Sequence, residues 1–191
     1  HALAFVPVGG LVVASVMWLA VGRWKGWRFS RVLLWAMAGY ATAGVLDACT
    51  SYGTHLGWPF TGDRVAWHLV SVIDPLFTLP LLVVFLAGWI RRSRWLPMAG
   101  LVFMAGYLGL AAVQRDRAED GARALARSRG HTVERLVVKP SIGNIVVWRS
   151  TYISTGRIQV DALRVGPWTG DVTSYPGKAT ELVEPEQALG D

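Results

Sequence analysis

The stretch that decides the fold is ALAFVPVGGLVVASVMWLAV, residues Ala2–Val21, which contains no charged side chain. A helix needs roughly 20 mostly apolar residues to cross about 30 Å of hydrocarbon, and this stretch has that length. Three further apolar stretches follow at Val32–Leu46, Val65–Ile90 and Pro97–Val113. The sequence therefore predicts a multi-pass membrane protein.

The four stretches differ in length. The first and third are long enough to span, and the second is long enough only if its helix continues to about Ser51. Pro97–Val113 is short, which indicates a tilted or marginal span. Tryptophan is concentrated near the ends of the stretches, where aromatic rings favour the membrane–water interface. These residues are Trp18, Trp24, Trp27, Trp35, Trp58, Trp67, Trp89 and Trp95.

The distribution of charge divides the chain in two. Of its 191 residues 17% are charged, against about 25% in a soluble domain. The only acids up to Gln114 are Asp47, Asp63 and Asp74, and the other ten follow it. We therefore predict a transmembrane helical bundle over 1–114 and a small soluble domain over 115–191. A soluble protein with buried helices is disfavoured, because core helices seldom run so long without a polar face.

The soluble part and the single cysteine exclude two other classes. Residues 115–191 carry 11 basic and 10 acidic side chains, so no nucleic-acid patch is expected. Cys49 alone excludes an intramolecular disulfide framework.

Ala2–Val21 lacks the basic segment that precedes the apolar part of a signal peptide. With no initiator Met, the chain is expected to begin inside a longer protein.

The short loops predict an orientation. Gly22–Arg31 contains four basic residues and no acid, and the next basic turn contains Arg91, Arg92 and Arg94. The positive-inside rule places both in the cytoplasm and loop 50–64 outside. The C-terminal domain would then also lie outside, although five arginines in Arg115–Arg129 argue against that. The usage of Ala, Arg and Trp, together with the family resemblance described below, predicts a bacterial inner membrane as the location.

The tail is expected to combine a helix with short strands. Arg115–Arg129 is typical of a helix, with Glu119 and Arg123 spaced for an ion pair and Gly130 as its C-cap. Thr169–Asp191 is expected to be loosely ordered. About 50 ordered residues make a small core, so this domain should lean on the bundle. Three β-prone runs predict the strands, at Val133–Val138, Asn144–Ile153 and Arg157–Val165. The predicted class is a mainly α membrane protein of about four transmembrane helices with a small C-terminal α+β domain.

Acids within apolar stretches are functional candidates, because a charge in a span is costly unless it meets a cavity, a partner or a metal. Asp47 lies near the outer end of the second stretch and Asp74 lies within the third. With His1 they are expected to form a polar site suited to a divalent metal, since imidazole and carboxylate groups are zinc ligands. The alternative is structural: Asp47 pairs with Arg64, and Asp74 caps a helix that begins at Pro75.

A family resemblance supports the metal site. The residues that carry it are Leu46–Thr54, Trp58–Phe60, Arg64, Ile73–Pro80 and, in the tail, Lys139–Asn144 with Trp148 and Arg149. They resemble the predicted membrane-bound metal-dependent hydrolases related to the bacterial YdjM, YbcI and YfhP proteins. His1 resembles the last histidine of a motif whose upstream part is missing here. The family also tends to have a histidine four residues before the position of Asp47, where this chain has Ala43.

The resemblance implies an inner-membrane metal-dependent hydrolase. The predicted orientation places its site at the outer face of the bilayer, and a site at that depth would act on a lipid or lipid-linked ester. His1, Asp47 and Asp74 would hold a divalent cation, zinc being the expected one. Arg64 would stabilise developing negative charge. His55, His68, Thr50 and Tyr52 are auxiliary candidates. The rival hypothesis is a non-enzymatic membrane protein whose cluster is structural or binds a lipid headgroup or an ion. A transporter is disfavoured, since the chain has no internal repeat. The oligomeric state stays open.

Overall fold

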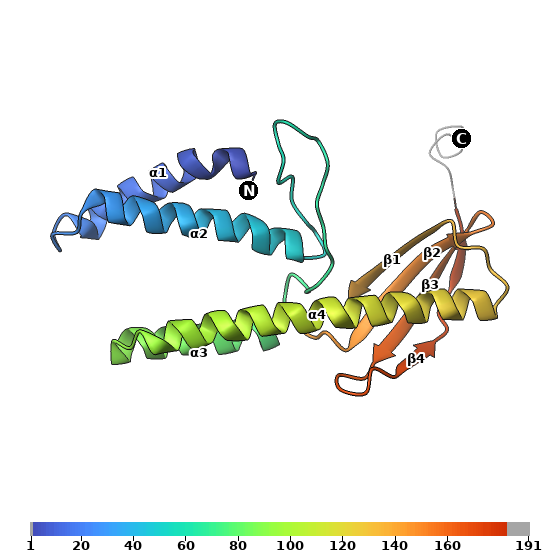
Figure 1. Ribbon diagram of the computed structural model, residues 1–191. Coiled ribbons are helices and arrows are strands. Elements are labelled where there is room, and N and C mark those ends of the chain that lie inside the picture. Colours follow the sequence, from blue (N-terminus) through green and yellow to red (C-terminus); the bar gives the residue numbers. More distant parts are fainter. Residues whose placement is uncertain (1, 183–191) are drawn as a thin grey trace. The chain divides into compact units, whose positions relative to one another are not determined.

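The structure is a computed structural model that describes residues 2–182. The chain forms two compact units, His1–His68 and Leu69–Asp191, and each is treated by itself below. Figure 1 shows four main helices followed by a sheet. The protein is thus mostly helical with a C-terminal antiparallel sheet, as predicted.

Unit 1 is a helical hairpin followed by a loop. A 3₁₀ turn η1 (Leu3–Phe5), helix α1 (Val6–Met17) and a π-helical turn η2 (Trp18–Gly22) form one continuous helical segment. Helix α2 (Phe29–Cys49) returns beside it. The helices come close because α1 has Gly9 and Gly10 where they meet. A Cβ on Gly9 would collide with the ring of Tyr40, and one on Gly10 would meet Met37.

The loop after α2 corrects the prediction for the third stretch. Residues 65–74, expected at the start of a span, are not helical. Val65 pairs with Thr54 in an isolated antiparallel bridge, and the Trp67 N–H donates to the Ala48 carbonyl at 2.7 Å. His68 adopts a positive φ of 53°. The helix begins at Pro75, whose fixed φ suits the first helical position.

Unit 2 begins with the hairpin of α3 (Pro75–Arg91) and α4 (Trp95–Ser128). The expected lengths of the last two stretches are reversed. α3 has 17 residues, or about 25 Å of helix, while α4 has 34 and joins the apolar stretch to the polar helix of the tail. Within residues 2–182, three segments are long and apolar enough to span a membrane: Leu3–Gly22, Phe29–Cys49 and Trp95–Ser128. The predicted boundary at Gln114 falls inside α4.

The sheet has the order β1-β2-β3-β4, with β5 also paired to β3, and all pairings are antiparallel. The strands are β1 (Arg135–Pro140), β2 (Val147–Ser154), β3 (Arg157–Val165), β4 (Val172–Tyr175) and β5 (Ala179–Glu181). The first three confirm the predicted strands within a few residues. The expectation of loose order after Thr169 is wrong for β4 and β5. Residues 183–191 lie outside the described part of the chain.

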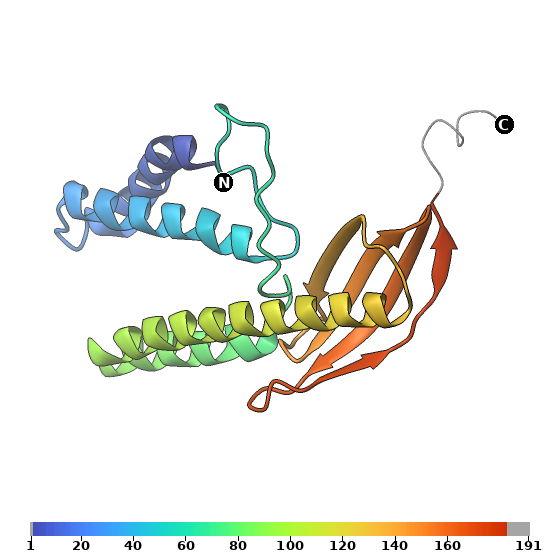
Figure 2. The same ribbon diagram turned by 45° about the vertical axis from the view of Figure 1, so that its right-hand side comes forward.

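The polar half of α4 covers one face of the sheet (Figure 2). Alternation along the strands directs every second residue toward the helix, and Trp148, Tyr152, Leu163 and Val165 are fully buried there. The helix presents Ala111, Ala118, Ala122 and Ala126, all buried. These small side chains let helix and sheet approach closely, which places the core of unit 2 between them.

Local signals in the tail behave as predicted. Glu119 pairs with Arg123 at 2.7 Å, and Gly130 follows α4 with a φ of +70°, as a glycine C-cap requires. The sheet also contacts the helical hairpin, because the Gly143 N–H donates to the Ile73 carbonyl at 3.0 Å, just before α3. The domain thus leans on the start of α3.

Candidate functional site

Asp74 is the buried acid of unit 2. Its side chain is 3% exposed, and its Oδ1 accepts the Phe77 N–H at 3.2 Å. Asp74 is therefore the N-cap of α3, as the Asp-Pro sequence predicts. The cap fixes the carboxylate at the point where the chain enters the helix.

Tyr107 fixes the other oxygen. Its hydroxyl donates to Oδ2 of Asp74 at 2.7 Å, and its ring packs against Phe77 with centroids 5.4 Å apart. The bond joins the start of α3 to the middle of α4. Sequence reasoning missed Tyr107, because a tyrosine 33 residues away in an apolar stretch gives no local signal.

Asp47 lies in unit 1, in the last turn of α2. Helical spacing places Tyr40, Ala43 and Asp47 along one face of that helix, and this periodicity could have identified Tyr40. Asp47 and Tyr40 both make interactions within the structure. The ion pairs recorded among residues 2–182 do not include the expected one between Asp47 and Arg64, and Arg64 is exposed.

Thr50 has a structural role at the end of α2. Its hydroxyl donates to the Asp47 carbonyl at 2.7 Å and accepts the Gly53 N–H at 3.3 Å. These bonds end the helix and begin the loop. Gly53 suits this turn, since its φ is +65° and a Cβ there would collide with the Val65 carbonyl. Tyr52, the neighbouring auxiliary candidate, is 70% exposed.

A small pocket of about 270 Å³ opens beside this face of α2. It combines aromatic walls with polar groups, and its lining residues are Ala2, Phe5, Tyr40, Thr54, His55 and Trp58. The loop that carries His55 is tied to the chain start by the Leu3 N–H, which donates to the Leu56 carbonyl at 3.0 Å. His55 Nδ1 lies 3.1 Å from the Gly62 carbonyl oxygen, so the other ring nitrogen remains for a ligand.

The predicted metal ligands are divided between the units. Asp47 belongs to unit 1, Asp74 belongs to unit 2, and His1 lies outside the described residues. Within residues 2–182, no three His, Cys, Asp or Glu side chains are grouped as a metal site would need. The donor types nevertheless suit a divalent cation. Two of the roughly four acceptor positions of the Asp74 carboxylate are used by Phe77 and Tyr107.

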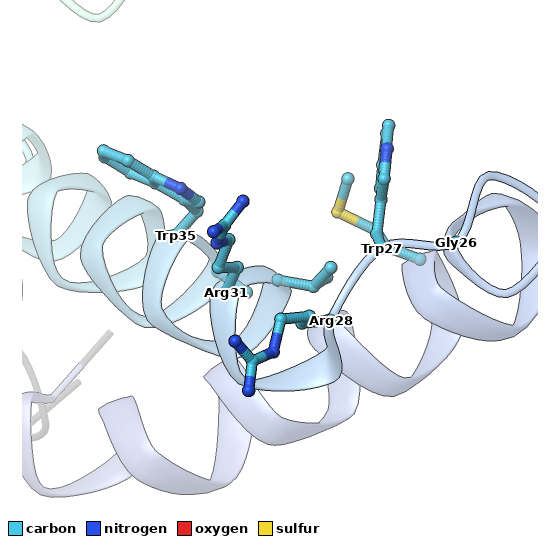
Figure 3. Close-up of a pocket in the computed structure, with 8 residues that line it drawn as sticks. Gly26, Trp27, Arg28, Arg31 and Trp35 are labelled. Atoms are coloured by element: carbon cyan, nitrogen blue, oxygen red, sulfur yellow. The ribbon is translucent and has the colours of Figure 1, made fainter.

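A second pocket of unit 1, of about 670 Å³, lies at the start of α2 (Figure 3). Trp27 and Trp35 stand on one side with Arg31 between them, and Arg28 points away. The residues of α2 that line this pocket, Arg31 to Ala36, lie about 17–24 Å along the helix from Asp47. Its tryptophans and arginines are typical of a membrane interface, and it does not belong to the polar site near His55.

An ion pair joins the end of α4 to the middle of β3. Arg129 holds both oxygens of Asp161 at 2.8 and 2.9 Å and also donates to the Tyr152 hydroxyl at 3.1 Å. Burial alone would raise the pKa of Asp161. Hydrogen bonds from Arg129 and the Gly177 N–H, together with the Arg129 and His131 charges, instead lower it. The same bond to Asp161 raises the pKa of Arg129, against the effect of burial. The pair is structural, since it ties α4 to β3.

Segments long and apolar enough to span a membrane, joined to a small helix-backed sheet, are typical of a membrane protein. The model of the family described as YdjM inner membrane protein matches residues 1–118. The chain belongs to this family, which confirms the resemblance to YdjM over residues 1–118. No curated protein and no solved structure matches the chain.

Proposed function

We propose that the protein is a membrane-embedded metal-dependent hydrolase that acts on a lipid or lipid-linked ester. The observation that carries the proposal is the buried carboxylate of Asp74. Two hydrogen bonds fix its orientation, and acceptor positions remain on both oxygens. A held carboxylate of this kind is what a metal site needs, because outer hydrogen bonds orient metal ligands.

In this proposal His1, Asp47 and Asp74 hold a divalent cation, with zinc as the expected metal. The bound metal supplies an activated water. Arg64 is exposed and takes part in none of the ion pairs recorded within residues 2–182, so its charge remains for an anionic substrate. His55 is the auxiliary candidate with a pocket beside it. The site requires Asp47 and Asp74 to come within reach of one metal ion.

A second candidate is a non-enzymatic membrane protein with a structural polar cluster. The same Asp74 contacts favour it, because a capping acid bonded to a tyrosine is a complete structural arrangement in itself. Under this hypothesis Asp74 stabilises the α3–α4 hairpin and binds no metal. The pocket beside His55 would then be a site for a lipid headgroup or an ion.

Metal content separates the two candidates. The protein is purified in detergent, and its metals are measured by mass spectrometry beside Asp47→Asn and Asp74→Asn, with Asp63→Asn as the control at an exposed acid. The hydrolase predicts near-stoichiometric metal that is lost in the first two variants and kept in the control. Folded wild-type protein that binds no metal when zinc or manganese is supplied would sink the proposal. Short-chain phosphoester and carboxylester lipids are then the first substrates to assay.

A further inference from the structure

The face of the sheet that points away from α4 carries basic side chains and no acidic ones. Residues directly across an antiparallel pair share a face. The register therefore shows which residues lie on the face that points away from α4, called here the open face. Its strand positions include four basic residues and no acid: Arg135, Lys139, Arg149 and Arg164, beside apolar and hydroxyl side chains. The ion pairs recorded within residues 2–182 include none of the four.

Three of these charges gather at one end, which we call the basic end: Lys139, Arg149 and Arg164. Lys139 is directly opposite Arg149 in the β1–β2 register. Arg164 is the diagonal neighbour of Arg149, because Arg149 pairs with Ala162 on β3. Like charges in such positions destabilise a sheet. Three neighbouring cations without an ion pair recorded within residues 2–182 attract an anion to this end of the sheet.

The basic end is the end of the sheet that lies against the apolar helices of unit 2. The loop between β1 and β2 is bonded to the start of α3 through Gly143 and Ile73. At the same end, the Gln114 amide lies 3.4 Å from the carbonyl oxygens of Val165 and Gly166. Gln114 is the first polar residue after the apolar stretch of α4. Both contacts therefore place this end where the apolar helices of unit 2 leave the hydrocarbon.

Two large apolar side chains project from the loops at this end. Ile142, between β1 and β2, is 73% exposed, and Trp168, between β3 and β4, is 86% exposed. The Ile142 loop is held in shape by Asn144, whose Oδ1 accepts the N–H groups of Val146 and Val147 at 3.0 and 2.6 Å. Tryptophan favours the interface between lipid and water. Exposed apolar tips beside a basic cluster are typical of a surface that rests on lipid headgroups.

A pocket of about 570 Å³ on the same part of the sheet is large enough to hold one lipid headgroup. Arg149 and Lys178 line it together with Val147, Val160, Ala162 and Tyr175. Its one acidic lining residue, Asp161, is 3% exposed and bonded to Arg129. A phosphate would thus meet cations, and the glycerol backbone would meet apolar walls.

We propose that the basic end docks on anionic phospholipids of the bilayer that holds the protein's own helices. Lys139, Arg149 and Arg164 contact lipid phosphates, while Ile142 and Trp168 insert among the headgroups. The docking holds the sheet domain against the membrane surface. It does not depend on the hydrolase proposal, because none of these residues belongs to the predicted metal site.

The test uses the full chain in nanodiscs of phosphatidylcholine alone or mixed with phosphatidylglycerol. Hydrogen exchange of residues 139–150 is followed by mass spectrometry, and Ile142→Cys carrying a polarity-sensitive dye gives a second readout. We expect anionic lipid to slow the exchange several-fold and to shift the dye emission to the blue. Added salt should reverse both effects, since exposed charges are screened over about 10 Å at 0.1 M.

The matched variants are two triple substitutions to glutamine. Lys139, Arg149 and Arg164 are replaced in one, and Arg123, Arg127 and Arg157, exposed but off the open face, are replaced in the other. The first should lose the response to phosphatidylglycerol and the second should keep it. Equal behaviour of the two triples, or of wild type in both lipids, would overturn the proposal. So would reversal by inorganic phosphate at constant ionic strength, which would assign the site to free phosphate.

Discussion

The hydroxyl oxygen of Tyr107 lies 2.7 Å from Oδ2 of Asp74, so one hydrogen bond joins the middle of α4 to the first residue before α3. The acid also caps α3 through Oδ1. Asp74 is thus held from both sides, and its two contacts can be removed separately. That separation makes Tyr107 the most informative residue to change in unit 2.

Tyr107→Phe should lower the free energy of unfolding by about 1.5–3 kcal/mol, the range for a hydrogen bond to a charged group. The ring and its contact with Phe77 are retained, so the change tests the hydroxyl alone. Thermal unfolding in detergent, followed by circular dichroism, measures the effect. Tyr175→Phe, at an exposed tyrosine without a recorded side-chain bond, is the control. An unchanged melting temperature for Tyr107→Phe would show that the bond contributes nothing.

Breaking the Asp161–Arg129 pair should destabilise the sheet domain. The side chains are 2% and 24% exposed, so Asp161→Ala leaves a largely buried arginine without its partner. We expect a loss of about 3 kcal/mol, the lower end of the range for breaking a buried pair, because Arg129 keeps some contact with water. Chemical denaturation with far-ultraviolet circular dichroism is the measurement. Asp116→Ala, at an exposed acid of α4, should change little.

The same pair predicts a direction for pH. The folded-state pKa of Asp161 is below its ordinary value near 3.9, so the unfolded chain binds the proton more readily. The stability that this carboxylate contributes is then present above about pH 4 and is lost as the pH falls through its folded-state pKa. Wild type should lose stability more steeply than Asp161→Asn below pH 4. Parallel curves for the two proteins would contradict this assignment.

Gly9 should tolerate no side chain, in contrast to Gly39. A Cβ on Gly9 would collide with the ring of Tyr40, whereas one on Gly39 would meet nothing within 4 Å. Alanine favours a helix over glycine by about 1 kcal/mol. Gly39→Ala should therefore be neutral or stabilising, and Gly9→Ala should lower the melting temperature and separate α1 from α2. Cross-linking between cysteines on α1 and α2 would report the separation, and a Gly9→Ala protein as stable as Gly39→Ala would refute it.

The predicted orientation can be tested with a membrane-impermeant maleimide on intact cells. Gly62→Cys lies in the loop expected outside and should be labelled directly. Lys25→Cys lies in a basic loop expected in the cytoplasm and should be labelled only after lysis. Cys49 is buried, so wild type provides the background. Labelling of Lys25→Cys alone in intact cells would reverse the orientation.

Composition and spacing were sufficient for the membrane class, the helix cap at Asp74 and the first three strands, because each depends on residues near in the chain. The continuity of α4 was not predicted. The first arginine after Val113 marks a change of solvent. The chain between Met104 and Arg115 has no proline, and the helix accommodates its two glycines, Gly106 and Gly109. A change of solvent was thus mistaken for the end of a helix.

The rest of the site and the last strands depend on partners far along the chain. β4 and β5 have four and three residues, too few to show a period, and they exist because β3 offers pairing positions. Tyr107 meets Asp74 only when the hairpin has formed. Asp47 and Asp74 were grouped because both are acids within apolar stretches, and the resemblance supported the grouping. Their meeting at one metal ion stays a prediction.

The unbroken course of α4 has a mechanical consequence. Its 34 residues form a rod about 51 Å long, with one half among lipids and the other fixed to the sheet by a close-packed core. A helix adjusts to a thicker or thinner bilayer by changing its tilt. A tilt of about 10° would swing the far end of the polar half, about 22 Å away, through roughly 4 Å. A change in the thickness of the bilayer that tilts α4 would therefore also move the sheet relative to the membrane surface.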